Sequence, residues 1–114
     1  MTALSVHMTH HLTHSVLALE GELDIASVAS LQPAVDTVIN SGRRHLVLDT
    51  AGITFSDSYG LWALLQAQRS ITAVDGAMEL IHVHGALQRV LDLTDLAGAF
   101  TIKPNDKAEV SADL

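Results

Sequence analysis

The residue types that could carry chemistry gather in one short segment, residues 54–60 (TFSDSYG), directly before an apolar helical run. This segment places an acid, a hydroxyl and a glycine where a buried strand is expected to give way to a helix. The first turn of a helix leaves backbone N–H groups unpaired and carries a partial positive charge, so it suits anionic groups. Asp57 and Ser58 are therefore candidates to cap the helix, and Ser58 is also a candidate to hold a phosphate.

Composition indicates a small globular domain around this segment. The chain has 114 residues, of which 48% are hydrophobic, enough for one core. It has no cysteine, which excludes disulfides and thiolate metal ligands. A formal charge of −7 with six Lys and Arg argues against nucleic acid or an anionic membrane as partner. We find no apolar run that could insert into a bilayer and no secretory leader, so a cytoplasmic protein is expected.

Hydrophobic periodicity predicts strands and helices that alternate along the chain. Strands are expected at residues 4–9, 15–20, 46–48, 79–83 and 100–102. Helices are expected from Ser27 or Ser30 to Gly42, over residues 60–73, and from about residue 87 to near Gly98. The second helix is expected to bury Leu61, Leu64, Leu65 and Ile71.

Local details of these elements depend on a few residues. If Ser30 caps the first helix, Pro33 lies in its first turn, where proline is accepted; a helix beginning at Ser27 would be kinked there. The strand at residues 46–48 is expected to end at Asp49 and to be buried on both faces. Ile53 and Phe55 are then expected to fill the core beneath the segment that leads to the Asp57 turn.

This order of elements predicts a single α/β domain with a mixed, mainly parallel β-sheet packed with α-helices. One domain is expected over residues 1–114, with its core at about residues 4–102 and a C-terminal tail at 103–114. In such sheets function gathers at the carboxyl ends of the strands. Asp24 and Asp57 each follow a predicted strand, so both are expected at that edge.

Three motifs together resemble the STAS family of anti-sigma factor antagonists and their relatives in sulfate transporters: residues 19–24 (LEGELD), 46–49 (LVLD) and 55–61 (FSDSYGL). The resemblance extends from about residue 4 to 102. It implies a STAS-like fold and a protein switch that binds an anti-sigma factor serine kinase and frees a sigma factor. The kinase then phosphorylates the first hydroxyl residue after the Asp, here Ser58, and the phosphorylated antagonist is released. A phosphatase resets it.

The resemblance also implies a partner-binding surface around the switch serine. The residues expected on it are Asp24, Asp57, Ser58, Tyr59, Gly60 and Trp62. Tyr59 departs from the family, in which a second Ser or Thr is usual at that position. Trp62 lies off the predicted buried face of its helix, so the two aromatic residues form a rim beside Ser58, or Trp62 packs beneath a neighbouring loop.

The main alternative is a STAS adaptor or scaffold in a signalling or transporter complex, which binds without phosphorylation. Enzymatic interpretations are weaker. Residues 56–60 lack the first glycine of a hydrolase nucleophile elbow, and nothing identifies an oxyanion hole. A response-regulator receiver would need an acidic pair after its first strand and a closing helix, and the sequence offers neither. We therefore expect no enzymatic activity and no cofactor.

The histidines raise the possibility of a metal site. His7, His10, His11 and His14 would share one face only if their segment were helical. Strand alternation on both sides of it argues against a helix, so surface histidines and no metal are expected. His82 and His84 flank Val83 and are expected to be polar residues at an exposed strand end.

Overall fold

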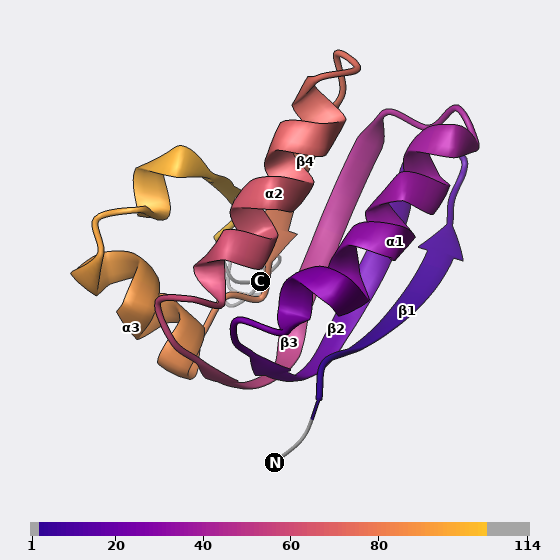
Figure 1. The fold of residues 1–114 in the computed structure, drawn as a ribbon. Helices are drawn as coiled ribbons and strands as arrows, with labels where there is room; N and C mark the ends of the chain where they lie inside the picture. The colour runs from indigo at the N-terminus through magenta and orange to yellow at the C-terminus, as the bar shows by residue number, and fades with distance from the viewer. Residues whose placement is uncertain (1–2, 105–114) are drawn as a thin grey trace, which may run out of the picture.

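The computed structural model describes residues 3–104, and a five-stranded sheet crosses this part of the chain (Figure 1). Its strands are β1 (Ser5–His10), β2 (Ser15–Leu23), β3 (His45–Ser56), β4 (Ala77–Ile81) and β5 (Thr101–Ile102). They lie in sequence order; β1 is antiparallel to β2, and the other neighbouring pairs are parallel. The predicted mixed, mainly parallel sheet is confirmed. The predicted tail beyond residue 104 lies outside the described residues.

The helices in the described chain are α1 (Ser27–Asn40), α2 (Leu61–Thr72), α3 (Gly85–Leu93) and a short 3-10 helix, η1 (Ala97–Ala99). Figure 1 shows α1 and α2 side by side across one face of the sheet. The alternation of β3 explains this layering: Leu46 and Leu48 are fully buried in the core, whereas Asp49 lies on the opposite face of the sheet and is half-buried. Each fully buried leucine contributes about 1.5–3 kcal/mol of hydrophobic stabilisation.

Strand β3 is longer than its apolar run predicted, because it continues past Asp49 to Ser56. Pairing with β2 holds the extension, but with two register shifts. The second shift falls between the Gly21–Ile53 pair and the Glu22–Phe55 pair. A bulge of this kind resets the alternation of buried and exposed positions. Ile53 is therefore buried as predicted, at 5% exposure, while the prediction that Phe55 fills the core is wrong, since it is 44% exposed.

Helix α1 begins at Ser27 and continues through Pro33. The alternative start at Ser30 is wrong, because the buried Ser27 hydroxyl ties the preceding turn to the helix. Its Oγ accepts the N–H of Asp24 at 2.9 Å and donates to the carbonyl of Glu22 at 3.3 Å. Pro33 lies on the solvent-exposed side of the helix.

The predicted ends of the fourth strand and of the third helix are wrong, because a residue at each place has a left-handed backbone conformation. Strand β4 ends at Ile81, before the predicted residue 83, because His82 has φ 59° and cannot continue a strand. The predicted helix from about 87 to 98 is divided: α3 ends at Leu93, and Asp95 has φ 62° before η1 begins. The second predicted helix is confirmed as α2, although Leu65, expected to be buried, is only partly so.

Candidate functional site

Two turns meet at the carboxyl ends of β2 and β3, at the bottom of Figure 1. One joins β2 to α1 at residues 24–26, and the other joins β3 to α2 at residues 57–60. Gly60 is packed against the first turn, since an added Cβ would lie 2.6 Å from the carbonyl carbon of Leu23. The N–H of Asp57 donates to the carbonyl of Leu23 at 3.3 Å. Asp24 and Asp57 therefore lie at one edge of the sheet, as the sequence predicts.

Asp57 caps the start of the helical turn that leads into α2. Its Oδ1 accepts the N–H of Gly60 at 2.8 Å, and its backbone carbonyl accepts the same N–H at 3.1 Å. A side-chain acceptor three residues before its donor is the usual geometry of a helix cap. Asp57 thus caps the turn at residues 57–60, and this hydrogen bond fixes the direction in which its carboxylate points. The prediction that Asp57 caps the helix is wrong, because α2 begins at Leu61 and has no side-chain cap.

Ser58 does not act as a cap. Its side chain is exposed, and within residues 3–104 its hydroxyl has no hydrogen-bond partner. Asp57 accepts the N–H of Gly60, and Ser58 lies in the turn before α2 with its side chain exposed to solvent. Another molecule can therefore reach the Ser58 hydroxyl, and the Asp57–Gly60 hydrogen bond holds the backbone of the turn that carries it.

Asp24 is held by its own turn in a similar way. Its Oδ1 accepts the N–H of Ala26 at 3.0 Å, and the side chain is half-buried. An open depression beside it is lined by Leu4, Glu22, Ser27 and other residues at the start of α1. The surface around the two turns is therefore acidic, and its carboxylates are oriented by backbone N–H groups.

Exposed apolar side chains flank the same turns. Tyr59 is largely exposed and Trp62 is half-exposed, so Trp62 is not covered by a neighbouring loop of the described chain. The guanidinium of Arg69 lies over the Trp62 ring at 5.5 Å from its centroid, which holds the indole along the outer side of α2. Ile25, next to Asp24, is also largely exposed. Sequence reasoning missed Ile25; an apolar residue inside a turn was the signal that could have found it.

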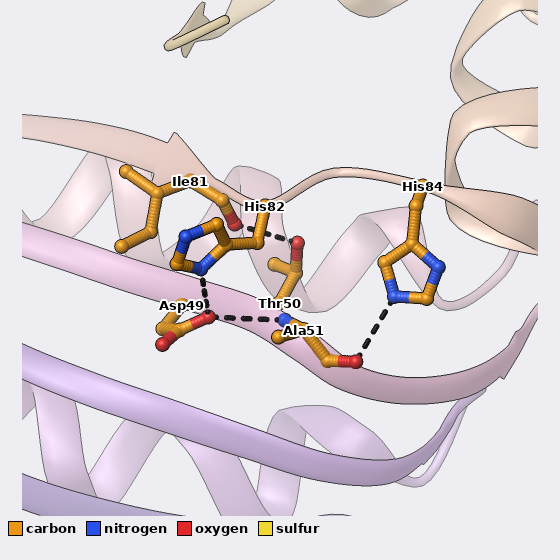
Figure 2. A network of polar contacts seen from close by, with 6 residues as sticks. All are labelled: Asp49, Thr50, Ala51, Ile81, His82 and His84. Atoms are coloured by element: carbon orange, nitrogen blue, oxygen red, sulfur yellow. Dashed lines mark hydrogen bonds and ion pairs between the residues drawn. The ribbon is translucent and has the colours of Figure 1, made fainter. Parts of the chain in front are cut away.

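Figure 2 shows that the histidines after β4 connect that segment to β3. His82 Nδ1 lies 2.9 Å from Asp49 Oδ1, which also accepts the N–H of Ala51 at 3.0 Å. His84 Nε2 donates to the carbonyl of Ala51 at 3.0 Å, and Thr50 donates to Ile81 at 2.9 Å. These side chains extend the link between β3 and β4 beyond the end of backbone pairing. Asp49 thus lies within a strand and pairs with His82.

Among residues 3–104, no group of three or more histidine or acidic side chains is arranged to hold a metal ion. No helix in this part of the chain is long and apolar enough to cross a bilayer. The features that the structure does bring together are two linked turns, two oriented carboxylates, a free hydroxyl and exposed aromatic rings.

The fold and the turns define a class of small α/β domain, with a mixed five-stranded sheet and an exposed serine at the start of its second helix. A family model of the STAS domain matches residues 5–108. The chain belongs to the STAS domain family, as its three motifs suggested.

Relatives and solved structures agree with this assignment. The chain is 31% identical over 110 residues to an anti-sigma F factor antagonist of Paenibacillus polymyxa, covering 96% of this chain and 92% of that protein. An anti-sigma factor antagonist from Mycobacterium paratuberculosis has a TM-score of 0.76 at 24% identity, over 96% and 93% of the two chains. The Bacillus cell fate determinant SpoIIAA in its phosphorylated form has a TM-score of 0.65 at 21% identity, over 95% and 99%. Both structures share the fold.

Proposed function

We propose that the chain is an anti-sigma factor antagonist whose binding is switched by phosphorylation of Ser58. The relative from Paenibacillus polymyxa, similar along nearly the whole chain, supports the antagonist function. The observation that carries the switch is the exposed hydroxyl of Ser58, which has no hydrogen-bond partner within residues 3–104. A structure of the same fold is described as a phosphorylated form.

In this proposal the unphosphorylated surface around Ser58 binds an anti-sigma factor that is also a serine kinase, and a sigma factor is set free. The surface consists of Asp24, Asp57, Ser58, Tyr59, Gly60 and Trp62. Tyr59 and Trp62 supply exposed aromatic area, which is favoured in binding hot spots. Gly60 contributes indirectly, because its missing side chain lets the two turns pack together.

Phosphoryl transfer requires little of this chain beyond a well-placed hydroxyl. The Ser58 oxygen attacks the γ-phosphorus of ATP held by the kinase, ADP leaves, and the hydroxyl proton passes to a base of the kinase. Because Asp57 holds the turn through the N–H of Gly60, Ser58 needs no rearrangement of its own backbone. The antagonist itself acts as a substrate and a binding partner.

The phosphate acts on the interface. It adds about −1.5 to −2 charges at neutral pH. Within the domain it would lie in the exposed turn before α2, near the positive end of that helix, so the fold is retained. In the complex it would have to be desolvated beside the carboxylate of Asp57, which is costly without a compensating cation. The partner is therefore released until a phosphatase removes the phosphate.

The experiment is to incubate the chain with candidate anti-sigma factor kinases and ATP, and to measure its intact mass. One phosphate is expected on the wild type and none on Ser58→Ala. Ser30→Ala is the matched control, because Ser30 is also exposed but lies on α1, and this variant should be phosphorylated like the wild type. Stable binding without any mass change would instead favour a STAS adaptor that works without a phosphoswitch.

A further inference from the structure

The end of the molecule opposite the Ser58 turn carries a second distinct surface. There the β1–β2 turn, residues 11–14, lies beside the α1–β3 turn, residues 41–44 (Figure 1). Arg43 joins the two, since its Nη1 donates to the carbonyl of His11 at 2.7 Å. The His11 ring stacks on the His14 ring at 4.8 Å, and the His14 ring lies 6.1 Å from that of His45. We refer to the surface formed by Leu12 and these residues as the Leu12 end.

Leu12 stands at the tip of this surface. The turn is closed by the N–H of His11 donating to the carbonyl of His14 at 2.8 Å, which leaves Leu12 at the outside of the bend. Its side chain is 100% exposed, whereas most leucines of this chain are buried in the core. A fully hydrated leucine at a convex tip meets no apolar group of its own domain.

The cations beside Leu12 are not neutralised by carboxylates of the described chain. Arg43 donates to a backbone carbonyl, and so does Arg44, whose Nη1 donates to the carbonyls of Ile39 and Arg43. Neither forms an ion pair with an acidic residue within positions 3–104, although the chain as a whole carries a formal charge of −7. Two guanidinium groups without an acidic partner in the described chain therefore lie beside Leu12.

Other charged groups face the Leu12 end from the neighbouring elements. From the sheet, Glu79 lies 3.8 Å from His45 and 3.8 Å from Lys103, so its charge is shared by two partners. Asp75 lies in the α2–β4 turn, and two residues later the N–H of Ala77 donates to the carbonyl of Arg44. The imidazoles on this surface are those of His10, His11, His14 and His45.

We propose that the Leu12 end docks on an anionic lipid surface. An exposed leucine surrounded by guanidinium and imidazole groups fits the boundary between acyl chains and phosphate headgroups, where apolar burial and attraction to anionic lipid act together. The surface is a convex tip, which suits a planar membrane. Docking in this orientation leaves the Ser58 turn on the far side, accessible to a soluble partner.

The net negative charge of the chain does not prevent this contact. The molecule extends 39 Å along its longest axis, and the Debye length at physiological ionic strength is about 8 Å. The carboxylates of Asp24 and Asp57 lie at the opposite edge of the sheet and are screened at the lipid surface. Asp75 and Glu79 lie nearer to the Leu12 end and reduce the attraction. The contact is nevertheless small, so the binding is reversible and weakens as salt is raised.

The test is sedimentation of the full chain with vesicles of phosphatidylcholine alone or with about one third phosphatidylglycerol. Binding is expected to the phosphatidylglycerol vesicles at low salt and to fall at high salt. Leu12→Ser should weaken it roughly ten-fold, and Arg43→Glu by about ten-fold or more. Matched controls on α3 are Leu93→Ser, at a leucine that is 83% exposed, and Arg89→Glu, at an exposed arginine. Both positions lie away from the Leu12 end, so both variants should bind like the wild type.

Two results would overturn the proposal. One is that the wild type binds phosphatidylglycerol vesicles no better than phosphatidylcholine vesicles at low salt. The other is that the control variants lose as much binding as Leu12→Ser and Arg43→Glu. If the Leu12 end bound polyglutamate but neither kind of vesicle, its partner would be an acidic protein and the lipid proposal would be wrong. Circular dichroism of each variant establishes that it is folded.

Discussion

Gly60 is packed against the carbonyl group of Leu23, 37 positions earlier in the chain, so closely that a Cβ at Gly60 would lie 2.6 Å from the carbonyl carbon. This contact joins the β2–α1 turn to the β3–α2 turn, and the N–H of Asp57 reinforces it by donating to the same carbonyl. The proposed partner surface depends on the contact, because residues of both turns belong to it.

Replacing Gly60 should therefore destabilise the domain. Gly60→Ala forces the two turns apart, and overpacking of this kind costs about 1–3 kcal/mol of unfolding free energy. Urea denaturation followed by circular dichroism measures the loss. Gly98→Ala is the control, since a Cβ there would meet nothing within 4 Å, and its midpoint should match the wild type. Equal midpoints for both variants would show that the turns are not tightly packed.

Removing the carboxylate of Asp57 should cost stability through the lost cap. Asp57→Ala leaves the N–H of Gly60 with only its longer backbone contact and should lower the free energy of unfolding by about 1 kcal/mol. Asp57→Asn keeps a side-chain oxygen in place, so it should recover most of that loss. If the asparagine variant were as unstable as the alanine variant, the cap would not be the source of the effect.

A negative charge at Ser58 should change binding and leave the fold intact. Ser58→Asp is expected to weaken binding of the anti-sigma factor at least ten-fold, because the added carboxylate lies beside Asp57 and must be desolvated in the complex. Its melting temperature should stay within about 3 °C of the wild type. Ser58→Ala, which adds no charge, should bind like the wild type. Calorimetric titration and thermal denaturation measure both quantities, and undiminished binding by Ser58→Asp would contradict the switch.

Trp62 is expected to matter for binding more than for stability. Because its ring is half-exposed and contacts Arg69, Trp62→Ala should cost only about 1 kcal/mol of unfolding free energy. The same variant should weaken partner binding by about 2 kcal/mol or more if Trp62 is an anchor of the interface. Leu93→Ala, which truncates an exposed apolar residue on α3, serves as the control and should leave binding unchanged.

Ile53 and Phe55 should differ in their contribution to stability, although they lie two residues apart in β3. Ile53→Ala removes a buried side chain and should cost about 2–5 kcal/mol. Phe55→Ala removes a side chain that is 44% exposed and should cost clearly less. Chemical denaturation of the two variants compares them directly. Similar losses would mean that Phe55 belongs to the core after all.

Much of the fold follows from local pattern. The alternation of apolar residues predicts β1 and β2, and helical spacing predicts α1 and α2, because each pattern depends only on near neighbours. Positions at which distant segments interact were predicted less well. The bulge that exposes Phe55 arises from the pairing of β3 with β2. Strand β4 ends where it does because His82 has a left-handed backbone conformation. Neither has a signature in its own segment.

The candidate site divides in the same way. The sequence predicts that Asp57 accepts a hydrogen bond at the turn before α2, which the structure has, although α2 itself carries no side-chain cap. Ser58 as the phosphate acceptor is implied by the resemblance to the STAS family and stays a prediction. The position of Ile25 beside this surface depends on the packing of two turns that are far apart in the chain, and so does the contact of Arg43 with His11 at the other end.

The amino-acid order alone determined the STAS family, the run of strands and helices, and the position of Ser58 at the start of a helix, because these depend on side-chain periodicity and short motifs. Only the tertiary structure decided that the Ser58 hydroxyl is left without a partner in the described chain, and that Arg43 meets the β1–β2 turn at the opposite end of the sheet. The physical reason is that burial, hydrogen-bond competition and local charge depend on which distant turns the parallel sheet brings together.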